Sequence, residues 1–285
     1  MSIVKFLNSL FFSHSVKKKE FEFDNVILEK NPDRVLEALK KYGVVIINNF
    51  ISHQDAETAK VKLLDWINKI DINQNSGDMG EFILNNNKFT FQEILAFNKP
   101  VMNIRDHDRN KVDGGMIDIF KVNELFKNAN GVDKIFKKMH ASYDKVFSSF
   151  KDTTFSSFNL YYNHSVTNPR GAHIDHSDGN EFKCFLYLTD VLTISHGPYS
   201  YVPKSHKKLF LLKLSTFFQR LANKFIKQSI YRYDDMQVND KLTMPLLGVA
   251  GTLIISNQSG IHGGAPQENG FERLVLVDSY RNNKK

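Results

Sequence analysis

The chain has 285 residues, of which 41% are hydrophobic and 24% are charged, a balance that is ordinary for a soluble globular protein. Its single cysteine, Cys184, excludes an intramolecular disulfide and a cysteine-based zinc site. Because a lone thiol suits a reducing compartment, a cytoplasmic location is expected. The net charge of +7 is typical either of an anionic partner or of solvated lysine-rich faces. With no zinc finger, RNA-binding signature or arginine cluster in the sequence, no nucleic-acid partner is expected.

Two basic segments have apolar residues at helical spacing, residues 1–20 at the N-terminus and residues 207–232 further along. No run reaches the roughly 18 consecutive apolar residues that a spanning helix needs. Residues 1–19 and 207–232 could instead lie on an anionic membrane surface, which would make the protein membrane-associated. The alternative is that both helices pack against the rest of the protein or a second subunit. The sequence favours packing and leaves both open.

The first half of the chain predicts helices with few strands. A capped helix ended by Gly43 is followed by an apolar strand, and a second amphipathic helix begins after Ser52. The polar, Asn-rich residues 71–90 are predicted to form a loop. A further strand and helix are predicted in residues 114–122 and 131–150.

After residue 153 the pattern changes to short strands separated by Gly, Pro and Asn. The predicted strands lie in residues 155–165, 171–176, 182–191, 199–206, 251–259 and 271–281. The basic segment of residues 207–232 interrupts them as a helical insert. Helices followed by a run of strands predict an α+β, mainly β, fold in which helices pack on an antiparallel sandwich or barrel.

Two overlapping H-x-D patterns stand in one short segment, His173 with Asp175 and His176 with Asp178. Residues i and i+2 of an extended strand point to the same face, so either pair can present an imidazole and a carboxylate together. His262, in a predicted loop, supplies a third ligand. Two histidines and one carboxylate that leave open positions are the arrangement of non-haem Fe(II) oxygenases. A single H-x-D is a weak signal: residues 106–108 read Asp-His-Asp and are predicted to be an exposed polar loop.

Arg273 follows His262 by eleven residues and lies inside an apolar strand. A buried guanidinium is costly without an acidic partner, and its planar fork grips a carboxylate with two hydrogen bonds. A dicarboxylate that chelates the metal at one end would satisfy Arg273 at the other. The alternative is a surface arginine on the outer face of the strand.

The chain resembles the phytanoyl-CoA dioxygenase family of Fe(II)/2-oxoglutarate-dependent oxygenases. The segments that carry this resemblance span most of residues 40–281 and read KYGVVIINNFIS, RGAHIDH, FLYLTDV, HGPYSYVPKSHKK and SGIHGGAPQENGFERLVLVDSY. The resemblance implies a double-stranded β-helix of the jelly-roll or cupin-like kind, with packed N-terminal helices and the helical insert. On this reading residues 21–285 form a single dioxygenase domain.

The same resemblance assigns roles to particular residues. His173, Asp175 and His262 would bind Fe(II), and Arg273 would hold the C5 carboxylate of 2-oxoglutarate. His206 resembles a family histidine with a structural role. Gly264 departs from several relatives, which have a hydroxyl residue there that helps to orient the co-substrate.

The remaining pocket candidates come from strand alternation. Asn159 and Tyr161 share one face of a strand and are predicted either to reach 2-oxoglutarate or the substrate or to pack in the barrel interior. Lys183 and Tyr187 have the same two interpretations. His176 is expected at the pocket rim or in a polar turn.

These observations predict a 2-oxoglutarate-dependent dioxygenase that uses Fe(II) and O₂ and releases succinate and CO₂. The substrate class is a small or lipid-linked metabolite, and hydroxylation is the expected outcome. The same chemistry giving desaturation or epimerisation is an alternative within enzymes. A non-catalytic jelly-roll binding module is the alternative from another class.

Overall fold

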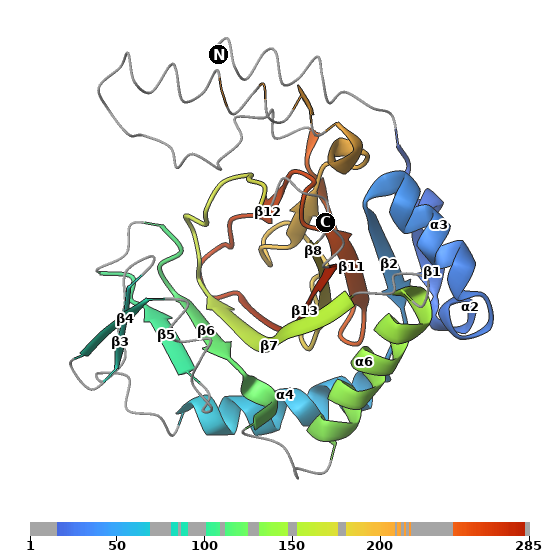
Figure 1. Ribbon diagram of the computed structural model, residues 1–285. Helices are drawn as coiled ribbons and strands as arrows, with labels where there is room; N and C mark the ends of the chain where they lie inside the picture. Colours follow the sequence, from blue (N-terminus) through green and yellow to red (C-terminus); the bar gives the residue numbers. More distant parts are fainter. Residues whose placement is uncertain are drawn as a thin grey trace.

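A computed structural model describes residues 16–68, 81–84, 87–90, 101–108, 112–124, 131–147, 153–175, 181–208, 210–211, 214, 217 and 242–282. The α-helices are α2 (Asn25–Lys30), α3 (Pro32–Tyr42), α4 (His53–Asn68) and α6 (Val132–Phe147). Short 3₁₀ turns cover Lys18–Glu20, Val122–Glu124 and Ser205–Lys207. Figure 1 shows the helices along the outside of a curved β-structure.

The described strands form a large mixed sheet, a small sheet and a hairpin. The eight-stranded sheet has the order β1 (Glu22–Asp24), β2 (Val44–Asn48), β11 (Leu253–Asn257), β8 (Glu181–Tyr187), β13 (Glu272–Asn282), β7 (Thr153–His164), β6 (Met116–Phe120), β5 (Val101–Arg105). The three-stranded sheet has the order β10 (Met244–Pro245), β9 (Tyr199–Tyr201), β12 (His262–Gly264). The prediction of a mainly β chain with added helices is confirmed.

The large sheet departs from the predicted antiparallel arrangement at one edge. β1 pairs with β2 in parallel, whereas the other pairs of this sheet are antiparallel. A parallel pair requires a crossover connection, and α2 and α3 supply it between these two strands. The N-terminal helices are thereby fixed against the sheet.

Local sequence explains the boundaries of α3. The Asn31 side chain accepts a hydrogen bond from the Arg34 N–H, and Pro32 occupies the first helical position. Gly43 ends the helix with a φ of 82°, a left-handed conformation that suits glycine. β2 follows at once, as predicted.

The two faces of the large sheet have different partners. On β8 and β13, alternate residues such as Cys184 and Leu276 are buried on the side of the helices, while Lys183, Tyr187 and Val275 line an internal cavity. The small sheet covers this inner face: the Tyr199 ring of β9 stacks on Phe185 of β8, with ring centroids 4.4 Å apart. The cavity therefore lies between the two sheets.

One predicted loop is wrong in part. Residues 81–90 contain a hairpin, in which β3 (Glu81–Leu84) pairs with β4 (Asn87–Thr90). In this hairpin Phe82 and Phe89 are register partners. The Asn-rich composition predicts a loop here, and the described residues 81–84 and 87–90 are instead paired strands.

The amphipathic segments lie largely outside the described residues. Residues 1–15 are not described, and of the insert the structure describes helical residues only at 210, 211, 214 and 217 beyond residue 208. The predicted membrane contact of residues 1–19 and 207–232 stays a prediction. Within the described part of the chain, no helix is both long and apolar enough to cross a bilayer.

A buried carboxylate on the helix side of β13 leads to a prediction about stability. Asp278 is fully buried, accepts a hydrogen bond from the Tyr280 hydroxyl, and has no partner for its Oδ1 atom. Burial raises the pKa of Asp278 well above its ordinary value. Near neutral pH this carboxylate must either take up a proton on folding or stay charged in an apolar site, so stability falls as the pH rises from the unfolded-state pKa towards the raised folded-state pKa.

Replacing Asp278 with Asn should raise the free energy of unfolding at pH 7 by about 1–3 kcal/mol, since the amide keeps the hydrogen bond and removes the charge. The gain should shrink as the pH falls below about 4, where the carboxyl is protonated in the unfolded chain as well. Urea denaturation at both pH values measures it, with Asp108→Asn in an exposed turn as the control. An unchanged or lower stability at pH 7 would contradict the prediction.

Candidate metal centre

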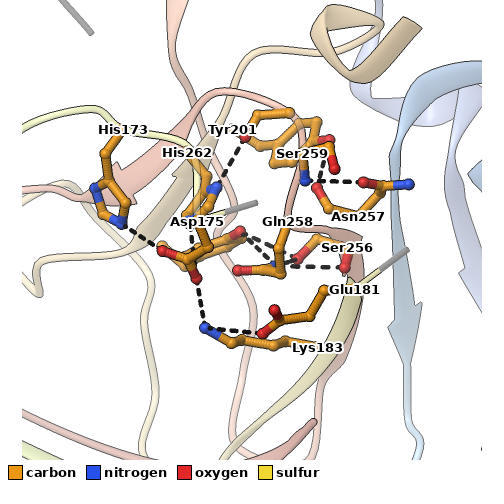
Figure 2. Close-up of polar contacts among 12 residues, drawn as sticks. His173, Asp175, Glu181, Lys183, Tyr201, Ser256, Asn257, Gln258, Ser259 and His262 are labelled. Carbon is orange, nitrogen blue, oxygen red and sulfur yellow. Dashed lines mark hydrogen bonds and ion pairs between the residues drawn. The ribbon is translucent and has the colours of Figure 1, made fainter. Parts of the chain in front are cut away.

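Three predicted ligands, His173, Asp175 and His262, converge on one point of the cavity (Figure 2). Their ligand atoms all lie within 4.8 Å of one another. The Asp175 Oδ1 atom lies 3.4 Å from the Nε2 atom of His173, and the Oδ2 atom lies 3.7 Å from the Nε2 atom of His262. Two imidazoles and a carboxylate gathered at this spacing can hold one metal ion.

Main-chain hydrogen bonds bring these residues together from distant parts of the sequence. The N–H of His173 donates to the carbonyl of His262 at 2.8 Å, and the N–H of His262 donates back at 2.9 Å. The N–H of Asp175 donates to the Gln258 carbonyl at 3.1 Å. Within the described residues 171–175 of the predicted strand, His173 forms a single bridge, and His262 begins β12 rather than lying in a loop.

A main-chain carbonyl holds the orientation of each imidazole. The Nδ1 atoms of His173 and His262 lie 2.8 Å and 2.9 Å from the carbonyl oxygens of Gly171 and Gly260. Because a carbonyl oxygen only accepts, each Nδ1 carries the proton and each Nε2 presents a lone pair toward Asp175. Hydrogen bonds from the far nitrogen of an imidazole to a carbonyl fix the tautomer that can bind a metal.

The protonation states also suit a metal. Burial alone would raise the pKa of Asp175, but the neighbouring Lys183 ammonium outweighs it and holds the pKa well below its usual range. Burial, together with the neighbouring His173, lowers the pKa of His262. An ionised carboxylate and neutral imidazoles are the forms that coordinate metal ions.

Lys183 contacts Asp175 directly. Its Nζ atom lies 2.5 Å from the Oδ2 atom of Asp175 and 3.8 Å from a Glu181 oxygen (Figure 2). Burial opposes its charge, yet Asp175 outweighs burial and raises the pKa of Lys183. The contact of Lys183 with substrate or co-substrate stays a prediction. In the structure Lys183 is paired with the Asp175 carboxylate.

The cavity that holds the triad has a volume of about 270 Å³. It is lined by Arg105, Asp113, Met116, Asp118, Tyr161, Asn163, Pro169, Arg170, His173, Asp175, Lys183, Phe185, Tyr187, Tyr199, Gln258, His262, Gly263, Gly264, Arg273 and Val275. The lining combines aromatic rings with charged groups and therefore suits a polar ligand.

Arg273 reaches this cavity from β13 and is 8% exposed. Its Nη1 atom donates to the Gly197 carbonyl, and its Nε atom has no hydrogen-bond partner. Burial lowers the pKa of Arg273, and no carboxylate of the described residues lies within ion-pair distance of it. A buried guanidinium that lacks an acidic partner among the described residues favours an anionic ligand.

The other predicted pocket residues have different surroundings. Tyr161 and Tyr187 line the cavity, and the Tyr187 hydroxyl donates to the Leu246 carbonyl at 2.9 Å. Asn159 is buried and does not belong to the cavity lining; its Oδ1 atom accepts a long 3.4 Å hydrogen bond from the Lys121 N–H. His176 lies outside the described residues. Roles for these residues stay predictions.

Sequence reasoning missed several cavity residues. Arg105, Asp113 and Asp118 belong to one charged cluster, in which Arg105 contacts both carboxylates at 2.7 Å and 2.6 Å. Tyr199 and Gln258 come from β9 and from the turn after β11. A signal existed for Asp118, because it stands alone among apolar residues in β6, as Arg273 does in β13.

His206, predicted to be structural, lies away from the triad and contacts the N-terminal helices. Its Nε2 atom lies 3.1 Å from the carbonyl oxygen of Lys40 in α3. Burial lowers the pKa of His206 to about 4, so the ring is neutral near pH 7. This contact links the turn after β9 to α3.

No protein-family model and no curated protein sequence matches the chain. Solved structures do resemble it. The non-haem α-ketoglutarate-dependent epimerase SnoN from nogalamycin biosynthesis, in complex with Fe³⁺, α-ketoglutarate and nogalamycin RO, has a TM-score of 0.53 at 11% identity, covering 91% of this chain and 85% of that chain. The non-haem α-ketoglutarate-dependent carbocyclase SnoK has a TM-score of 0.54 at 10% identity, covering 90% and 85%.

At such low identity the likeness shows a shared fold. The chain therefore has the fold of non-haem iron enzymes that depend on 2-oxoglutarate, and a His-Asp-His cluster lies in its internal cavity. The resemblance to the phytanoyl-CoA dioxygenase family in particular remains an expectation, since no family model matches.

Proposed function

We propose that the chain is an Fe(II)/2-oxoglutarate-dependent oxygenase of the phytanoyl-CoA dioxygenase-like kind. On this proposal the large and small sheets are the two halves of a double-stranded β-helix. His173, Asp175 and His262 hold Fe(II), and Arg273 binds the far carboxylate of 2-oxoglutarate. The observation that carries the proposal is the buried Arg273, which has no acidic partner among the described residues and shares its cavity with the triad.

The residues present fit the absent groups. Both Nε2 lone pairs and the Asp175 carboxylate face one point, and the backs of the imidazoles are hydrogen-bonded to main-chain carbonyls. A facial set of three protein ligands leaves further metal positions for a chelating co-substrate. Bound Fe(II) with 2-oxoglutarate and O₂ supplies an oxidant that removes hydrogen from a substrate, with release of succinate and CO₂.

The protein's own residues position and shield this chemistry. The Lys183 ammonium donates a hydrogen bond to the Oδ2 atom of Asp175 and so orients the carboxylate. The aromatic rings of Phe185, Tyr187 and Tyr199 form a wall of the cavity and limit access of water. Arg273 would hold the far carboxylate of the co-substrate and so orient it within the cavity.

The substrate class on this proposal is a small molecule, or the small head group of a lipid-linked one, and the expected product is hydroxylated. Desaturation and epimerisation begin with the same removal of hydrogen, so product analysis by mass spectrometry separates them from hydroxylation. A non-catalytic binding module is the remaining alternative. It predicts no turnover of 2-oxoglutarate under any condition.

Succinate formation tests the proposal and also the choice between the overlapping H-x-D pairs. Wild-type protein supplied with Fe(II), 2-oxoglutarate and O₂ should form succinate slowly even without substrate. His173→Ala and Asp175→Ala should abolish this activity, because each removes a ligand, and His176→Ala should retain it. If His176→Ala lost the activity while His173→Ala kept it, the ligand assignment would be wrong.

A further inference from the structure

The cavity wall formed by β6 and β7 contains polar atoms that the proposed metal and co-substrate sites do not use. Asp118 is 2% exposed, and its Oδ2 atom accepts a hydrogen bond from the Nη2 atom of Arg105 at 2.6 Å. Its Oδ1 atom has no hydrogen-bond partner. Asn163 of β7 is 5% exposed, lines the same cavity, and likewise has an Oδ1 atom without a partner.

These two oxygens specify the chemistry of what would contact them. A carboxylate oxygen and an amide oxygen only accept hydrogen bonds. A buried polar atom left without a partner destabilises the fold, and such atoms are rare in native structures without a ligand or water. A ligand group that donates hydrogen bonds, such as a hydroxyl or an ammonium, would satisfy either atom.

Asp118 lies apart from the proposed co-substrate site, whereas Asn163 stands opposite Arg273 itself in the pairing of β7 with β13 and borders that site. In the register of the large sheet, Asp118 of β6 stands opposite Tyr161 of β7, which stands opposite Val275 of β13. Asp118 is therefore two strand spacings, about 10 Å, from the strand that carries Arg273. Arg273 has no acidic partner among the described residues, whereas Asp118 is paired with Arg105, so a dicarboxylate is attracted to the β13 side.

The Arg105 cluster holds this wall in place. The Nη1 atom of Arg105 donates to the Oδ2 atom of Asp113 at 2.7 Å, and the Oδ1 atom of Asp113 accepts from the Arg170 N–H at 2.6 Å. Because Arg170 precedes the ligand His173 by three residues, the loop that leads to the metal centre is tied to the same cluster. The wall formed by β6 and β7 and the candidate metal centre therefore line the same cavity, and the Arg105 cluster holds their relative position.

Resting on the proposed function, we propose that Asp118 and Asn163 form a substrate subsite that binds an alcohol or amine group. The substrate is then a compact hydroxylated or aminated molecule. An unbranched hydrocarbon or acyl chain would leave both acceptors buried without a partner.

Three probes with one ring and different head groups test this subsite: cyclohexylamine, cyclohexanol and cyclohexanecarboxylate. Their dissociation constants are measured by ligand-observed NMR titration, with the protein alone and with Zn(II) and 2-oxoglutarate added. We expect the amine or the alcohol to bind about tenfold more tightly than the carboxylate, and Asp118→Asn to weaken the amine about tenfold, the ratio that one charge-assisted hydrogen bond supplies. Asp108→Asn, in an exposed turn, is the matched control and should change nothing.

Amine and alcohol binding equally would indicate a hydroxyl group in the natural substrate, and tighter amine binding would indicate an ammonium. The proposal is overturned if the carboxylate binds as tightly as the donors, if neither donor binds, or if Asp118→Asn leaves the amine affinity unchanged. Should Asp118→Asn not fold, the comparison of head groups in the wild-type chain and in Asn163→Leu decides. Failure of the proposed function would be seen separately, as absence of 2-oxoglutarate binding. Binding of the three probes to the metal-free chain would still test the subsite in that case.

Discussion

Replacing Arg273 with Leu should raise the dissociation constant of the metal-loaded protein for 2-oxoglutarate about 100-fold. The guanidinium is buried in the cavity, and its Nε atom is without a partner. Two charge-assisted hydrogen bonds to a carboxylate contribute about 3 kcal/mol, and each 1.4 kcal/mol is tenfold in affinity. Isothermal titration of the Mn(II)-loaded protein with 2-oxoglutarate measures the change.

Arg281→Leu is the matched control, because Arg281 belongs to the same strand and is exposed at its end. It should leave the affinity unchanged. Arg273→Leu should also leave the free energy of unfolding of the metal-free protein unchanged or raised, since the side chain it removes is a buried charge with no acidic partner among the described residues. Equal affinity for 2-oxoglutarate in both variants would show that Arg273 has another role.

His262→Ala should weaken binding of a divalent metal more than 100-fold. Loss of a residue that only hydrogen-bonds to a metal ligand costs about 10- to 100-fold in metal affinity, and loss of the ligand itself should cost more. His262 is 3% exposed and is bridged to His173 through the main chain, so no other described histidine can take its place. Competition titration with a chromophoric chelator and Zn(II) measures the affinity without requiring activity.

His107→Ala is the control for His262→Ala, since His107 lies in an exposed turn outside the triad. Its metal affinity should equal that of the wild type. Retention of wild-type affinity by His262→Ala would mean that the metal is held elsewhere, and the ligand set would then have to be revised.

The parts of the fold that the sequence predicts well have strong local signals. The capping residues of the helix that ends at Gly43 can be recognised in the sequence, and the strands β2, β8, β11 and β13 are rich in apolar residues. The juxtaposition of His173, Asp175 and His262 was predicted through the resemblance and through strand alternation. The hydrogen bonds to Gly171 and Gly260 that orient the imidazoles depend on loop geometry and have no sequence signal.

The missed residues show where local reasoning fails. Asp118 carries the same signal as Arg273, a charged residue inside an apolar strand, but no downstream motif drew attention to it. Arg105 stands at the edge of a segment that reads as polar loop, and only the pairing of β5 with β6 places it in the cavity. Tyr199 in an apolar strand is indistinguishable from a core aromatic until the small sheet is packed over the large one.

The central claim is that one cavity binds Fe(II) and 2-oxoglutarate together. Anaerobic titration of the protein with Fe(II), with and without 2-oxoglutarate, tests it most directly through the weak visible charge-transfer absorption of the chelate. The account predicts a band that appears only when both are present. Absence of the band from folded protein would contradict the account and would favour a non-catalytic binding module with the same fold.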